Sequence, residues 1–95
     1  MKYEDVALQD NESAQCFELW IDDQRSFIEY ENRDNKVYLV HTEVPSTMEG
    51  RGIASALVEK TFQHLEKQDK QVVPHCAYIQ TFLRRHPEWE RIVGK

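Results

Sequence analysis

Apolar and polar side chains alternate along two segments in the first half of the chain, which is the pattern of β-strands with one buried face. In residues 17–21 every odd-numbered side chain is apolar, and residues 26–31 are rich in aromatic and β-branched types. Residues 37–40 are apolar at every position, which predicts a third strand that is central and covered on both faces. Turn-forming residues separate these segments, so we expect an antiparallel meander. The polar residues 1–13 are expected to form a flexible or loosely paired leader.

The second half of the chain changes to a helical spacing of apolar residues. Pro45 cannot donate to a sheet ladder, so the third strand ends after Val44 and a loop follows. From Ala54 to Leu65 apolar side chains recur every three or four positions, and charged residues occupy the remaining face. This spacing predicts an amphipathic helix directly after the loop.

A short strand and a second helix are predicted beyond that helix. Residues 71–73 end at Pro74, and a crossover of this length makes the strand parallel to the third one, through a right-handed connection. Residues 76–85 predict a helix that stops before Pro87, after which Trp89 folds back as a lid. The predicted fold class is therefore α/β (α+β), with a mixed, mostly antiparallel sheet, one βαβ unit and two helices.

Length and composition are those of one globular domain. The 95 residues can bury a single core, and 40% of them are hydrophobic, so we treat residues 1–95 as one domain. The formal net charge of -5 disfavours nucleic acid and anionic lipid as partners. No apolar run is long enough for a signal peptide or a membrane span, so we expect a cytoplasmic location and no membrane partner.

Two of the three glycines, Gly50 and Gly52, lie directly before the predicted helix. Glycine permits positive φ, so alternating glycines can turn several N–H groups toward one anion, such as a pyrophosphate, at the positive end of the helix dipole. The loop is not a Walker A motif, because no Lys-Ser/Thr pair follows it, and it lacks the third glycine of the dinucleotide-binding fingerprint. The Gly-x-Gly pattern alone is equally consistent with a tight turn that binds nothing.

Residues 49–54, Glu-Gly-Arg-Gly-Ile-Ala, resemble the Q/R-x-x-G-x-G/A pyrophosphate loop of the GCN5-related N-acetyltransferases. Gly52 and Ala54 match the last two positions, whereas Glu49 stands where Gln or Arg is usual. The surrounding sequence resembles the short YjdJ-type subgroup, and the resemblance covers residues 37–89. The segments that carry it besides the loop are 41–45, 72–78 and 85–89.

The resemblance implies how a cofactor would lie. The pantetheine arm of acetyl-CoA would pair with residues 39–44, wedged between that strand and the strand at residues 72–73, and the phosphates would reach residues 50–54. The chain lacks the helices and strands that usually build the acceptor pocket of this family, so the acceptor site is expected to be shallow or shared. The cofactor-binding residues expected from the resemblance are Val44, Glu49, Gly50, Arg51, Gly52, Ile53, Ala54 and Cys76.

Acetyl transfer requires a base for the amine, donors for an oxyanion and an acid for the leaving thiolate. Cys76 is the first catalytic candidate, because it lies at a helix N-terminus and the resemblance places it near the thioester; the ordinary alternative is a small buried hydrophobe. His41 and Glu43 share a strand face and are candidate proton relays, unless they serve packing and solvation. Tyr78 is a candidate acid or a packing residue. Cys16 and Cys76 lack zinc-ligand spacing, so we expect free thiols and no metal.

Two functions remain open from the sequence. An N-acetyltransferase would pass an acetyl group from acetyl-CoA to a primary amine of an unidentified small-molecule or protein acceptor, acting as a monomer or weak homodimer. The alternative is a non-catalytic acyl-CoA-binding or protein-interaction module, which would use its sheet edge and the surface of residues 82–89. Turnover with an amine separates the two, because both predict binding of CoA.

Overall fold

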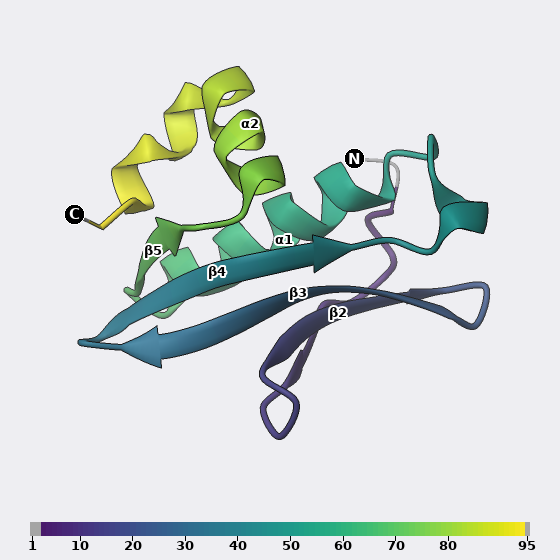
Figure 1. Ribbon diagram of the computed structural model, residues 1–95, viewed down its shortest axis with the longest axis horizontal. Helices are drawn as coiled ribbons and strands as arrows, with labels where there is room; N and C mark the ends of the chain where they lie inside the picture. The colour runs from purple at the N-terminus through teal and green to yellow at the C-terminus, as the bar shows by residue number, and fades with distance from the viewer. Residues whose placement is uncertain (1–2, 95) are drawn as a thin grey trace.

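The computed structural model describes residues 3–94 as a five-stranded sheet with helices packed against it (Figure 1). None of the helices in this range is long and apolar enough to cross a membrane. In chain order the elements are β1 (Gln9–Asn11), β2 (Cys16–Ile21), β3 (Gln24–Arg33), β4 (Lys36–Glu43), the 3-10 helix η1 (Ser46–Met48), α1 (Ile53–Lys67), β5 (Gln71–Pro74), α2 (Ala77–Arg85) and the 3-10 helix η2 (Pro87–Ile92).

The strands are ordered β1-β2-β3-β4-β5 across the sheet, so each strand pairs with its neighbour in the chain. The pairs from β1 to β4 are antiparallel, and β4 pairs with β5 in parallel. The sheet is therefore mixed and mostly antiparallel with one βαβ unit, which confirms the predicted fold class. Parallel neighbours cannot be joined by a hairpin, and α1 supplies the crossover between β4 and β5.

The segment expected as a flexible or loosely paired leader is in contact with the rest of the fold from Tyr3 onward. Tyr3, Val6 and Leu8 pack against the core, and β1 pairs with residues 16–18 of β2. The packing of these three side chains is not expected from the sequence, because three widely spaced apolar residues give little periodic signal. The short β1 also pairs the backbone groups of β2, which would otherwise form an open edge. Residues 1 and 2 of the expected leader lie outside the described residues.

A register shift between β3 and β4 changes which side chains of β4 face the core. Leu39 lies opposite Tyr30, and His41 lies opposite Glu29, so Val40 has no partner of its own. An extra residue in one strand reverses the alternation of side chains beyond it. As a result Leu39 before the bulge and Thr42 after it share the core face, although their positions differ by an odd number.

One core fills the space between the sheet and the helices. Phe62 of α1 packs edge-on against Phe82 and Trp89, with ring centroids 5.6 Å and 5.5 Å away, so Trp89 folds back as predicted. Tyr38 and Val40, on the other face of β4, are only half-buried. The prediction that this strand is covered on both faces is therefore right for one face only. The reason is that α1, α2 and η2 all contribute to the same core.

Candidate functional site: the loop before α1 and its groove

The loop between η1 and α1 holds two glycines in a conformation that other residues rarely adopt. Gly50 and Gly52 have φ angles of 79° and 77°, in the left-handed region. A side chain with a Cβ would cost about 1–2 kcal/mol at each of these positions, so glycine determines the path of the chain. The bend leads directly into α1, which begins at Ile53.

Within residues 3–94, the backbone N–H groups along this bend have no hydrogen-bond acceptor. Those of residues 50–55 donate no hydrogen bond to any other group within residues 3–94. The first bond of the helix comes from the N–H of Ala56, which donates to the carbonyl of Gly52 at 3.1 Å. The N–H groups before it are the unpaired donors found at the start of every helix, and in this chain the row of donors extends back through the bend to Gly50. A row of donors at the positive end of a helix dipole is suited to binding an anion.

A hollow of about 210 Å³ lies against the loop. Six residues expected to bind the cofactor line it, together with three side chains for which no cofactor contact was expected. Met48 belongs to η1, Ser55 to the first turn of α1, and Tyr78 to α2, so residues distant in the sequence close the hollow. The expected residues in its wall are Val44, Glu49, Gly50, Gly52, Ile53 and Ala54.

The side chain of Arg51, the central residue of the loop, does not line this hollow. Its Nη1 lies 3.1 Å from Sδ of Met48 and 3.5 Å from a carboxylate oxygen of Asp22, in the turn between β2 and β3. The carbonyl of Arg51 accepts a hydrogen bond of 2.8 Å from the hydroxyl of Tyr3. Arg51 thus contacts Asp22 and Tyr3 outside the hollow and Met48 in its wall, while the glycines on either side of it contribute to the wall.

A second hollow of about 340 Å³ adjoins the first along α2. Ser55 and Tyr78 line both hollows, so the two lie side by side, and we call them together the loop groove. Sequence reasoning missed its second half, because that half depends on how α2 lies beside α1. The loop groove therefore has N–H donors at one end and cationic or protonatable side chains at the other. The remaining residues of the second hollow are Thr81, Phe82, Arg85 and His86.

Tyr78 forms the wall that the two hollows share. Burial raises the pKa of its phenol, and the positive charge of Arg85 offsets only part of that rise. The hydroxyl therefore stays protonated at neutral pH and can donate a hydrogen bond into the groove. Among the described residues no hydrogen bond joins it to Cys76, so the two candidates are not brought into direct contact.

Cys76 lies where β4 and β5 separate. Their pairing ends at Leu39 and Pro74, while β4 continues to Glu43. The N–H groups of His75 and Cys76 both donate to the carbonyl of Leu39, each at 3.0 Å, which turns the chain away from β4 and into α2. The buried thiol of Cys76 donates to the hydroxyl oxygen of Thr42 at 3.3 Å. Sequence reasoning missed Thr42, because only the bulge in β4 brings this side chain to the core face.

His41 and Glu43 form a separate pair at the end of β4. Nε2 of His41 lies 3.7 Å from a carboxylate oxygen of Glu43, and both side chains are more than half exposed. Adjacent residues of a strand face opposite ways, so this pair and Thr42 lie on opposite faces of the sheet. The structure therefore brings His41 to Glu43 as expected, and keeps both on the face away from the Cys76 thiol.

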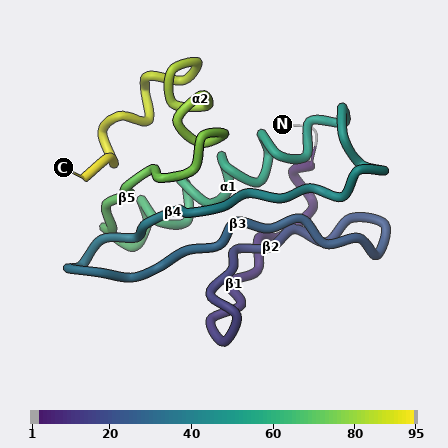
Figure 2. The backbone as a smooth tube through the Cα atoms, viewed as in Figure 1, coloured from purple at the N-terminus to yellow at the C-terminus, as the bar shows by residue number. Residues whose placement is uncertain are grey.

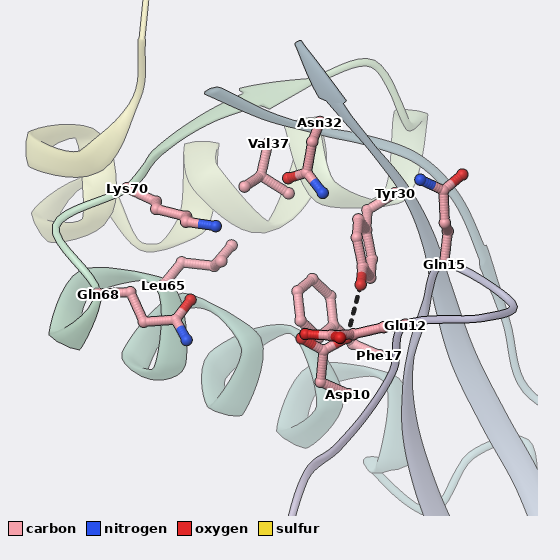
Figure 3. A pocket seen from close by; sticks show the side chains of 10 residues that line it. All are labelled: Asp10, Glu12, Gln15, Phe17, Tyr30, Asn32, Val37, Leu65, Gln68 and Lys70. Carbon is pink, nitrogen blue, oxygen red and sulfur yellow. Dashed lines mark hydrogen bonds between the residues drawn. The ribbon is translucent and has the colours of Figure 1, made fainter. Parts of the chain in front are cut away.

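A further hollow of about 340 Å³ lies by the last turn of α1, away from the loop (Figure 3). Its wall is mostly polar, and the hydroxyl of Tyr30 donates to Asp10 at 2.6 Å across it. We place the candidate site at the loop groove instead, because this hollow contains neither a helix start nor any residue expected to act on a thioester. No group of side chains that could hold a metal ion occurs within residues 3–94.

Comparison with known proteins identifies the family to which the chain belongs. A model of the GCN5-related N-acetyl-transferase family matches residues 16–92. The Bos taurus protein named Protein NATD1 is 39% identical over 51 residues, which are 54% of this chain and 45% of the relative. Protein NATD1 of Xenopus tropicalis is 36% identical over 64 residues, covering 66% and 59% of the two chains. The chain thus spans about half the length of the curated relatives it matches.

The fold is also found among solved structures. The NMR solution structure of a Staphylococcus aureus protein, described as GCN5-like, superimposes with a TM-score of 0.71. The superposition covers 96% of this chain and 90% of that one, at 17% sequence identity. At this identity the similarity shows a shared fold, and the match of residues 16–92 carries the family assignment.

Proposed function

This chain belongs to the GCN5-related N-acetyltransferase family, and from that premise we propose that it binds acetyl-CoA in the loop groove and transfers the acetyl group to an amine. The observation that carries the proposal is the row of unpaired N–H groups of residues 50–55, which face no acceptor within residues 3–94. A diphosphate needs several donors at close range and no bulky side chain in the way, and a glycine bend that opens a helix meets both needs.

The extent and charge of the loop groove suit binding of the nucleotide end of the cofactor. With the diphosphate at the bend, the adenosine portion would extend past Ser55 and Tyr78 along α2. Coenzyme A carries a further phosphate on its ribose, and Arg85 and His86 offer a guanidinium and an imidazole at that end of the groove. These two side chains would complement a second anionic group that the bend cannot reach.

The acyl end of the cofactor would lie where β4 and β5 separate. Beyond Leu39 the edge of β4 has no strand partner on the β5 side within residues 3–94, so its backbone can pair with the amide groups of a pantetheine arm. Such pairing would bring the thioester toward Cys76 and Thr42, which meet at that point. We propose that Cys76 then contacts the sulfur of the leaving group.

We propose that Cys76 acts as a proton relay. The amine nitrogen attacks the thioester carbon, the carbon–sulfur bond breaks, and the thiol proton of Cys76 passes to the departing CoA sulfur. The Cys76 thiolate is then reprotonated by the proton that the new amide nitrogen must lose, so no other reactant is consumed. Glu43, beside His41, would accept the first proton of an incoming ammonium group from the open face of the sheet.

The alternative, a non-catalytic module that binds acyl-CoA, has one observation in its favour. The proposed acceptor face near His41 and Glu43 is exposed, and no helix within residues 3–94 covers it. The edge of β5 is a poorer partner surface, because Val93 forms a bridge with Val72 and the N–H of Gly94 donates to the Val72 carbonyl at 2.8 Å. A partner protein would therefore dock on the face rather than on this edge.

Turnover with purified protein tests the proposal. We expect acetyl-CoA to raise the melting temperature of the wild type, and free CoA to be released when a panel of primary amines is supplied. Cys76→Ala should bind CoA normally and release it about a hundredfold more slowly, at the lower end of what loss of an acid–base group costs. Cys16→Ala is the matched control, since Cys16 is also a buried free cysteine but lies in β2.

Three outcomes distinguish the acetyltransferase from the non-catalytic module, and the proton relay from a covalent route through Cys76. Binding with no release across the amine panel would favour the non-catalytic module. Full activity of Cys76→Ala would exclude the proton relay. An acetyl group detected on Cys76 by intact-mass analysis would replace the relay with a covalent route through an acetylated thiol.

A further inference from the structure

The N-terminal segment reaches the loop before α1. The backbone trace brings this segment beside the start of α1, and Tyr3 donates its hydroxyl hydrogen to the Arg51 carbonyl at 2.8 Å (Figure 2). The ring of Tyr3 packs against the core, as do Val6 and Leu8, and the N–H of Val6 donates to the Tyr3 carbonyl at 3.1 Å. Tyr3 is therefore fixed by its own turn and by apolar contact as well as by the bond to the loop.

The bond constrains one peptide plane of the loop. In a trans peptide the carbonyl of one residue and the N–H of the next point in opposite directions. Tyr3 holds the carbonyl of Arg51 on the outer side, so the N–H of Gly52 is directed away from Tyr3. Gly52 lines the hollow against the loop, and its N–H has no acceptor within residues 3–94. The orientation of this donor is thus set by a contact outside the groove.

The glycine after this peptide makes such a constraint useful. Gly52 has a positive φ, and an added Cβ there would meet nothing within 4 Å. Rotation of the peptide between Arg51 and Gly52 changes φ of Gly52, and glycine allows a wide range of φ because it has no Cβ. The guanidinium of Arg51 is held beside Asp22, but that contact is made through a flexible side chain and does not fix the carbonyl.

We propose that Tyr3 is a positioning residue for the anion-binding loop: its hydroxyl holds the peptide between Arg51 and Gly52 so that the Gly52 N–H faces the cofactor diphosphate. The inference rests on the proposed function for its ligand. It also extends the site beyond the segment that the family model matches, since residues 16–92 do not include Tyr3. The N-terminal segment then belongs to the cofactor site rather than to a separate leader.

Removal of the hydroxyl alone tests this role. Tyr3→Phe keeps the ring and its packing, and we expect the dissociation constant for CoA, measured by titration calorimetry, to rise about three- to tenfold, as for loss of one hydrogen bond. Tyr30→Phe is the matched control, because it removes a tyrosine bond to the N-terminal segment, at Asp10, far from the loop. It should change the affinity for CoA by less than about twofold.

A second measurement needs no ligand. The 15N order parameter of the Gly52 amide in the free protein should be lower in Tyr3→Phe than in the wild type, because the peptide loses its anchor, while that of Gly94, bonded to Val72, should be unchanged. Affinity for CoA within about twofold of the wild type, or an unchanged order parameter at Gly52, would overturn the role of Tyr3. Failure of the wild type to bind CoA would instead reject the proposed function, and the order parameters would still decide whether Tyr3 holds the loop.

Discussion

At the scale of single residues, the buried side chain of Glu18 is a charge held by several hydrogen bonds. Glu18 is 4% exposed and accepts hydrogen bonds from Arg25 at 2.6 Å and from Asn11 and Trp20 at 3.1 Å each. Burial alone would raise the pKa of this carboxyl, but the hydrogen bonds from these three partners outweigh it and lower the pKa below its ordinary value of 4.5. The carboxylate form is thus the one that the fold stabilises.

A depressed pKa in the folded state contributes stability above the unfolded pKa, and this contribution is lost as pH falls through the folded value. Chemical denaturation of the wild type should therefore give a stable plateau near neutral pH and a loss below about 4.5. Glu18→Gln should be about 1–3 kcal/mol less stable at pH 7 and should show a shallower loss in acid. Glu29→Gln, at an exposed position in β3, is the control. An acid transition of equal steepness in Glu18→Gln and the wild type would contradict this assignment.

Residues in the candidate site differ in how far the sequence predicts them. Gly50 and Gly52 are predictable, because two of the three glycines stand together directly before a helical pattern, where the chain must turn sharply. Thr42 and Arg85 are not, because their places depend on a bulge and on the packing of one helix beside another. The local pattern of residue types predicts backbone conformation, whereas contacts between elements distant in the sequence depend on how the whole core packs.

At the scale of elements, the junction between the loop and α1 determines the site. Helix propensity and apolar spacing predict α1 well, and the structure begins it at Ile53, one residue before the start of the predicted stripe. The strand β1 could not be predicted, because three residues of polar sequence, Gln9–Asn11, carry no alternation. Its formation depends on the open edge of β2.

The left-handed conformation of Gly52 can be tested by a single methyl group. Gly52→Ala should lower the free energy of unfolding by about 1–2 kcal/mol, because the added Cβ meets no neighbour and acts only through the backbone angle. The same change should weaken binding of CoA, since relief of the strain turns the N–H groups of the bend. Gln63→Ala, on the exposed face of α1, should alter stability by less than about 0.5 kcal/mol. Equal stability of Gly52→Ala and the wild type would mean that the bend differs from the one described.

At the scale of the whole molecule, one core supports two differently exposed surfaces. The loop groove lies among η1, the start of α1 and α2, whereas His41 and Glu43 face away from the core at the end of β4. The order of the strands could be predicted from the sequence, because each strand pairs with its neighbour in the chain. The division between the side that holds the loop groove and the open side could not be predicted, because it follows from the packing of α1, α2 and η2 on one face.

The central claim is that the N–H groups of residues 50–55 bind the diphosphate of coenzyme A. Titration of the 15N-labelled protein with CoA, followed by amide chemical shifts, tests it most directly. We predict saturable shifts that are largest for residues 50–55, with smaller ones along α2 at Arg85 and His86. Amides of residues 50–55 that stay unmoved at saturating CoA, or shifts centred on the polar hollow by Tyr30 and Asp10, would contradict this claim.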